Sequence, residues 1–204
     1  MTQHDQQQHH GTRAADWDPV STAARARRIL AEEARAEIIA FLQCLQLSEG
    51  GFAGRDGVTD LYYTMFALDG LTALDAEPRD VAAVDDVLAN CDPRHLDFVH
   101  LACLVRAAAR MPNASQLVLA SLEELEVYRS LDGGYSHLRR NAAAGTVYAA
   151  YLAFLAYRAA GIDPPRFRTV IPSVLALQAA DGGFSNERAA RESTATATAG
   201  AVVL

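Results

Sequence analysis

The stretches Glu49-Gly50-Gly51-Phe52, Asp132-Gly133-Gly134-Tyr135 and Asp181-Gly182-Gly183-Phe184 share one pattern within a chain of 204 residues. In each of them an acidic residue precedes two glycines and an aromatic residue. A carboxylate can cap backbone N–H groups, glycine allows a positive φ, and the ring can pack against a neighbouring unit. Three copies of this loop predict an internal repeat.

Around these loops, amphipathic helical segments alternate with segments that are almost wholly apolar. The amphipathic segments are expected at residues 21–47, 79–89, 114–129 and 166–179, and the apolar ones at 60–74, 96–111, 146–160 and 193–204. Pro19 after Asp18 suits the first position of a helix. The alternation predicts an all-α fold of helical hairpins, with apolar inner helices covered by an outer layer. An open solenoid also suits such hairpins, but a continuous inner layer favours a ring.

The composition fits one structured domain at residues 19–204 behind a disordered polar tail at residues 1–18, which is rich in Gln and His. The net charge of −7 and the absence of lysine argue against nucleic acid as a partner. We interpret Cys44, Cys91 and Cys103 as buried thiols in a reducing, cytoplasmic setting, since they fall in or beside helical segments and no secretory signal is visible. The apolar stretch 141–157 is rich in alanine and suits protein packing, so we expect no integral membrane segment.

These repeats resemble those of protein prenyltransferase β subunits and of squalene and oxidosqualene cyclases. A glutamine precedes two of the glycine loops, as Gln46 and Gln178, and Arg129 takes that place before the other. The segment from Gly50 to Arg55, followed by Asp60-Leu61-Tyr62-Tyr63-Thr64, is similar to a loop and inner-helix start of bacterial prenyltransferase-like repeat proteins. The resemblance implies an α/α toroid around an apolar cavity, with more hairpins than this chain supplies.

The resemblance implies the zinc site of prenyltransferases. There an Asp, a Cys two residues later and a distant His hold the metal. Asp60 matches the Asp, but Tyr62 stands at the Cys position, and in a second alignment Tyr63 stands at the His position. A neutral phenol is a poor zinc ligand, so we expect no cofactor from this chain alone. Zinc would need ligands from further sequence or from a partner.

The resemblance also assigns substrate-binding positions. Arg55 matches an arginine that contacts the diphosphate of the substrate, although the accompanying lysine is absent; pairing of Arg55 with Asp56 or Asp60 is the alternative. Aromatic residues on the expected inner helices suit an isoprenoid chain, or else form plain core. They are Tyr62, Tyr63, Phe66, Tyr148, Tyr151 and Phe154.

Three functions remain open from the sequence. The first is an isoprenoid-handling transferase of prenyltransferase type, and the second is a module that binds a lipid or a peptide without catalysis. The third is a glycosidase-like hydrolase with Asp60 and Glu192 as its carboxylates. Residues 200–204 carry no C-cap signal, so we expect either a continuation of the chain or association with a second subunit or copy through an open edge.

Overall fold

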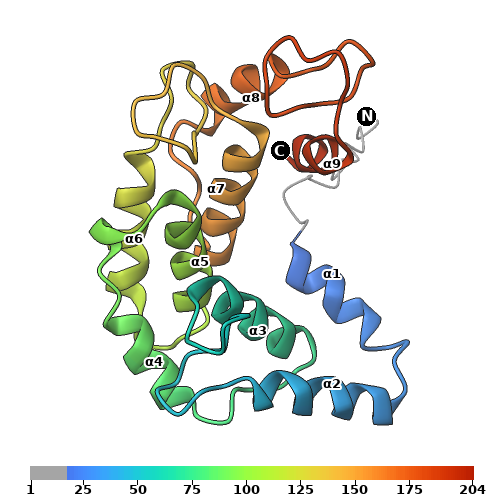
Figure 1. Ribbon diagram of the computed structural model, residues 1–204, viewed down its shortest axis with the longest axis vertical. Coiled ribbons are helices and arrows are strands. Elements are labelled where there is room, and N and C mark those ends of the chain that lie inside the picture. Colours follow the sequence, from blue (N-terminus) through green and yellow to red (C-terminus); the bar gives the residue numbers. More distant parts are fainter. Residues whose placement is uncertain (1–17) are drawn as a thin grey trace, which may run out of the picture.

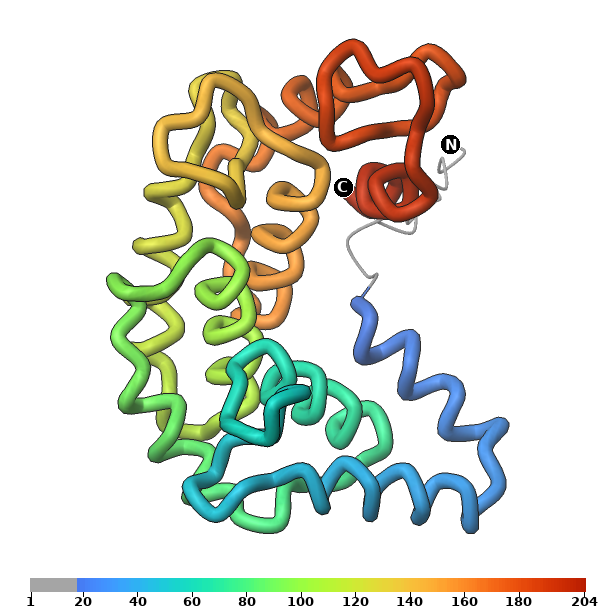
Figure 2. Tube along the Cα trace, in the orientation of Figure 1, coloured from blue at the N-terminus to red at the C-terminus, as the bar shows by residue number. Residues whose placement is uncertain are grey.

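The computed structural model describes residues 18–204, and the regular secondary structure of this range is helical. Five helices line the concave side of an arc, and each contacts the next in the series. They are α1 (Pro19–Ala26), α3 (Leu61–Ala73), α5 (Phe98–Ala108), α7 (Val147–Ala160) and α9 (Ala195–Val203). The outer layer contains α2 (Glu32–Cys44), α4 (Val81–Ala89), α6 (Ser115–Glu126) and α8 (Phe167–Leu175). Figure 1 shows the two layers, and Figure 2 shows that the trace leaves the arc open between α9 and α1.

The predicted all-α class is confirmed, whereas the closed toroid stays a prediction. The α3 helix lies in the inner layer, as its apolar sequence predicted, and contacts α1 and α5. A short 3₁₀ helix, η2 (Pro93–His95), takes the place of a glycine loop before α5. None of the helices in residues 18–204 combines the length and the apolar character that a membrane span requires.

The prediction of one helix over residues 21–47 is wrong, because the chain reverses between α1 and α2. Val20 is buried beside the inner layer, whereas Ile39 and Leu42 pack from outside against the core around α3. One straight helix cannot reach both layers. Asp18 caps α1 by accepting a hydrogen bond from the Ser21 N–H at 2.8 Å, and Pro19 is its first residue, as predicted. The rest of the predicted tail, residues 1–17, lies outside the described residues.

The core lies between the two layers in two clusters of buried side chains. One cluster joins α3, α4 and the middle and end of α5 around Phe52, and the other joins α5 to α9 around Tyr135. The α5 helix contributes to both clusters, and all of its residues except Val99 and His100 are buried. Phe52 and Tyr135 therefore anchor the first two glycine loops in the core, as the sequence pattern predicted, and Phe184 of the third loop is partly buried against it.

The three glycine loops, at residues 46–52, 129–135 and 178–184, have one backbone geometry. In each loop the first and last residues form an antiparallel bridge pair, Gln46 with Phe52, Arg129 with Tyr135 and Gln178 with Phe184. The first glycine of each pair has a positive φ, at +108°, +87° and +89° for Gly50, Gly133 and Gly182. The shared geometry confirms the internal repeat.

The first two loops also touch the outer helix of the next hairpin, and this contact requires glycine. A Cβ atom built on Gly50 would lie 2.0 Å from the Ala83 carbonyl oxygen of α4, while one built on Gly182 would meet nothing within 4 Å. Both glycines have a positive φ, so the two positions differ mainly in the available space. They form a matched pair for a test of the close approach.

We therefore predict that Gly50→Ala destabilises the protein more than Gly182→Ala does. Both substitutions cost about 1–2 kcal/mol through the left-handed backbone, and Gly50→Ala costs about 1–3 kcal/mol more because α4 must move. Urea unfolding followed by circular dichroism at low protein concentration measures both variants. Equal losses of stability would show that the approach of α4 to the loop does not depend on glycine.

Candidate functional site

A cavity of about 250 Å³ lies on the concave side between α3, α5 and α7. The N-caps of these helices are Asp60 in α3, Asp97 in α5 and Thr146 in α7. The lining residues of each helix stand at the second, fifth, sixth or ninth position after its N-cap. Such spacing places side chains on one face of a helix. Lining the cavity are Tyr62, Met65, Phe66, Val99, Ala102, Cys103, Arg106, Tyr148, Tyr151, Leu152 and Leu155, with Pro19 of α1 beside them.

Aromatic side chains form much of the wall of this cavity. The rings of Tyr62 and Phe66 meet edge to face at a centroid distance of 4.8 Å, and 49% of Phe66 is exposed. His137 packs against the ring of Tyr148 at 5.0 Å. Burial raises the pKa of both Tyr148 and Tyr151, so their phenols are neutral near pH 7. The cavity thus presents ring faces and neutral hydroxyls.

The one cation in the lining, Arg106, is already paired. Its guanidinium forms a buried ion pair with Asp69 of α3, and Arg110 binds the same carboxylate at 3.0 Å. The guanidinium carbon of Arg106 also lies 5.9 Å from the centroid of the Phe66 ring. The pair joins α3 to α5 at the cavity wall, and because Arg106 and Arg110 share one carboxylate, the three groups together keep one positive charge.

Cys103 lines the cavity as a thiol. Burial raises its pKa to about 12, so its thiolate is scarce at neutral pH. A thiolate is the form that attacks electrophiles and binds metals. Cys103 therefore contributes apolar surface to the wall.

Asp60, the carboxylate expected at the site, is the N-cap of α3. It accepts hydrogen bonds from the backbone N–H groups of Tyr62 at 2.8 Å and Tyr63 at 3.1 Å. Thr146 and Thr194 cap α7 and α9 at the same place in the repeat. Within residues 18–204, no group of His, Cys, Asp and Glu side chains is arranged to hold a metal ion. Asp60 between two phenols does not fit the zinc that the resemblance implies.

The predicted substrate-binding residues fall into two groups. Tyr62, Phe66, Tyr148 and Tyr151 line one cavity, as the aromatic pattern predicted. Arg55 is exposed in the loop before α3 and, within the described residues, forms no ion pair with Asp56 or Asp60. Tyr63 packs beside Tyr62 at 5.9 Å but lies outside the lining.

Two further candidates lie away from the cavity. Phe154 packs against Phe167 on the far side of α7, at a centroid distance of 5.7 Å. Glu192 is exposed in the loop before α9, so the two carboxylates considered for a hydrolase do not meet in the cavity.

The sequence-based prediction missed the residues of α5 in the lining, Cys103 and Arg106 among them. Alignment of the inner helices on their capping residues would have found them, because the same positions line the cavity in all three helices. The sequence pattern in α5 was weak, because α5 has small residues and an arginine at the positions where α3 and α7 have aromatic rings.

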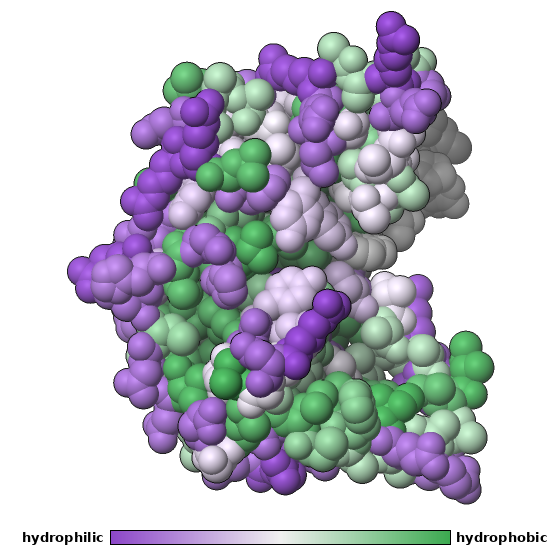
Figure 3. Space-filling view, in the orientation of Figure 1, coloured by the Kyte–Doolittle hydropathy of each residue, from purple (hydrophilic) through white to green (hydrophobic). Residues whose placement is uncertain are grey.

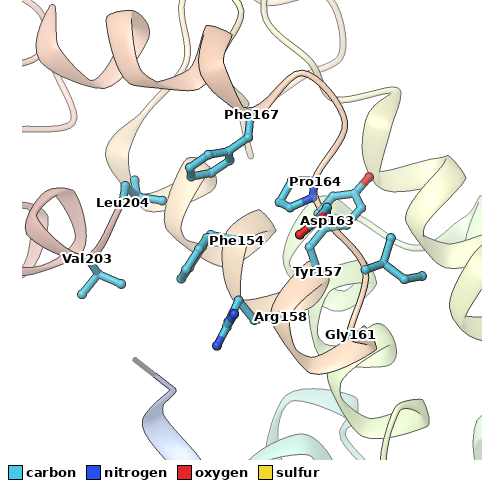
Figure 4. Close-up of a pocket in the computed structure, with 10 residues that line it drawn as sticks. Phe154, Tyr157, Arg158, Gly161, Asp163, Pro164, Phe167, Val203 and Leu204 are labelled. Carbon is cyan, nitrogen blue, oxygen red and sulfur yellow. The ribbon is translucent and has the colours of Figure 1, made fainter. Parts of the chain in front are cut away.

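Two larger pockets, of about 430 and 560 Å³, lie where the inner helices end. Figure 4 shows the first, where the rings of Phe154 and Phe167 face each other beside Val203 and Leu204. Eight residues of the second pocket each have a counterpart 86 positions later in the first. Leu68 corresponds in this way to Phe154, and Val81 corresponds to Phe167. Both pockets are therefore copies of a groove that the repeat creates, which makes the aromatic cavity the better candidate site.

Comparison of this chain with family models, with curated proteins and with solved structures finds no match. The resemblance to prenyltransferases and cyclases therefore stays a prediction from the quoted motifs.

The buried ion pair yields a prediction about stability. We expect Asp69→Asn to lower the free energy of unfolding by about 3–5 kcal/mol, because Arg106 would stay buried without a countercharge. Asp75→Asn is the control, since it removes an exposed pair with Arg27 that contributes about 0–1 kcal/mol. Urea unfolding measures both variants. A loss for Asp69→Asn no larger than that of the control would contradict the role assigned to this pair.

The prediction of three buried thiols is wrong for Cys44, which is exposed, and for Cys91, which is partly exposed, whereas Cys103 is buried. This difference in burial yields a prediction about reactivity. At pH 8 we expect iodoacetamide to modify the exposed Cys44 fastest and Cys103 slowest, because burial both shields Cys103 and keeps it protonated. Burial also raises the pKa of the partly exposed Cys91, which should react at an intermediate rate. Peptide mass spectrometry over time gives the three rates. Rapid modification of Cys103 in the folded protein would show that it is not buried as described.

Proposed function

We propose that this protein binds an apolar chain of the isoprenoid type in the cavity between α3, α5 and α7. The observation that supports the proposal most directly is the exposure of rings inside a concave site. Tyr62 and Phe66 remain 40% and 49% exposed there, although they belong to the inner layer. Covering such rings with an apolar ligand is favourable, at about 25 cal/mol for each Å² removed from water.

The size and chemistry of the cavity favour part of a long chain over a compact polar molecule. Its volume of about 250 Å³ lies below the roughly 300–1,000 Å³ of typical small-molecule sites. Aromatic and aliphatic side chains form most of the wall, and Arg106 is engaged in its ion pair with Asp69. Unsaturated chains suit ring faces through dispersion contacts.

Binding without catalysis by this chain alone is the role that the residues support best. The carboxylate of Asp60 is engaged in capping α3, and Cys103 is protonated. A transferase of prenyltransferase type, with metal ligands from another segment or subunit, is the second candidate. Arg55 favours it, because this exposed cation lies in the loop that leads to Tyr62 and is available to an anionic head group.

Calorimetric titration with farnesol, farnesyl diphosphate and inorganic diphosphate separates these candidates. The proposal expects farnesol and farnesyl diphosphate to bind and inorganic diphosphate not to bind. If Arg55 contacts the head group, Arg55→Ala weakens farnesyl diphosphate and leaves farnesol unchanged. Absence of binding by both farnesyl compounds would overturn the proposal.

We predict that Tyr62→Ala weakens farnesol binding about tenfold, which corresponds to roughly 1.4 kcal/mol of lost contact. Tyr63→Ala is the matched control, since this neighbouring ring lies outside the cavity, and it should bind farnesol as the unchanged protein does. The same titration measures both variants. Equal affinities for the two variants would place the ligand elsewhere.

A further inference from the structure

The first two glycine loops each contact the outer helix of the next hairpin. The side-chain amide of Gln46 donates to the Asp80 carbonyl oxygen at 2.7 Å, and Gly50 lies against Ala83 of α4. In the second loop, Arg129 takes the place of Gln46 and donates to a carbonyl oxygen at the start of α8. Gly133 lies there against Thr169. This repeated contact joins successive hairpins.

The third loop, residues 178–184, has the same geometry but no outer helix against it. The amide of Gln178 donates to the Gly182 carbonyl oxygen of its own loop at 2.9 Å, and a Cβ atom on Gly182 would meet open space. Among the described residues, this receiving face is therefore uncovered.

The adjoining inner helix, α9, is uncovered on the same end of the arc. Its residue at the eighth position after the N-cap, Val202, is 77% exposed. The residues at this position in α3, α5 and α7 are Leu68, Val105 and Phe154, which are at most 8% exposed. We call Val202 and the third loop together the receiving edge.

The other end of the arc carries the complementary face, on α2. The residue five positions before Arg129 or before Gln178 lies on an outer helix. In α8 this residue is Ser173, which contacts Gly134 of the preceding glycine loop. The equivalent residue of α2 is Phe41, which is 60% exposed, and no glycine loop precedes it within residues 18–45. Figure 3 shows apolar residues gathered over α2 at the lower right. We call this face of α2 the inserting edge.

Charged side chains lie near both edges. Glu37 and Glu33 stand one and two helical turns before Phe41 on the same stripe of α2, and both are exposed. Arg191 is exposed beside the third loop, where the Ala180 N–H donates to the Ala190 carbonyl oxygen. Asp181 of the third loop and Glu192 are exposed beside Arg191, so the receiving edge carries both signs of charge and the match between the edges lies in their shape and apolar surface.

We propose that α2 of a second copy of this chain docks on the receiving edge, head to tail. The occupant is a second copy because each chain carries both halves of the contact that already joins its own hairpins. The interface is heterologous, so one copy contributes Phe41 and the other contributes Val202 and Gly182. The proposal does not depend on ligand binding in the aromatic cavity.

Sedimentation velocity of the full chain, over about a hundredfold range of concentration, tests the association. We expect the unchanged protein to associate as its concentration rises, and Phe41→Glu and Val202→Glu each to lower association by at least tenfold. Leu138→Glu is the matched control, because Leu138 is exposed in an internal loop away from both edges, and it should associate normally. A protein that stays monomeric throughout would overturn the proposal.

Mixing the two variants distinguishes head-to-tail docking from other dimers. Each variant keeps one intact edge, so an equimolar mixture should form a heterodimer although neither variant associates alone. This recovery also shows that both variants are folded. Two results would contradict a head-to-tail interface. One is a mixture that fails to associate, and the other is that only one of the two substitutions lowers self-association.

Discussion

The backbone hydrogen bond between each glycine loop and the start of the following inner helix is the constraint on which the arc depends. The aromatic residue of the loop accepts it from the N–H of the capping residue. Phe52 accepts it from Asp60 at 3.1 Å, Tyr135 from Thr146 at 2.8 Å and Phe184 from Thr194 at 2.9 Å. Since the bond joins main-chain atoms, it persists although the capping residue changes. It fixes where each of these inner helices begins and therefore which residues face the concave side.

The aromatic cavity follows from a register that these bonds set for α3 and α7 and that α5 shares through its own N-cap, Asp97. The same positions of α3, α5 and α7 face one another, so the chemistry of the cavity is decided by what the sequence places there. In α5 the register brings in Arg106, whose charge is tolerated because Asp69 of α3 lies within reach. A buried cation without that carboxylate would be strongly unfavourable. The ring surfaces of Tyr62 and Phe66 thus lie beside a polar pair that helps to hold two inner helices together.

The loops of the repeat also explain why the ends of the arc differ from its interior. Gln46 and Arg129 use different side chains for one task, the capture of a carbonyl oxygen at the start of the next outer helix. Gln178 retains the loop geometry without that partner. A repeat unit is completed by its neighbour, so a terminal unit exposes surface that an internal unit buries.

The sequence by itself determined the helical class, the repeat and the inner position of α3, because turn chemistry and hydrophobic periodicity are local properties. It also indicated the four aromatic residues that share the cavity, since they recur on equivalent apolar helices. Only the tertiary structure decided the break between α1 and α2 and the pairing of Asp69 with Arg106. These features depend on which layer a segment must reach and on contacts between residues distant in sequence. No local pattern encodes such contacts.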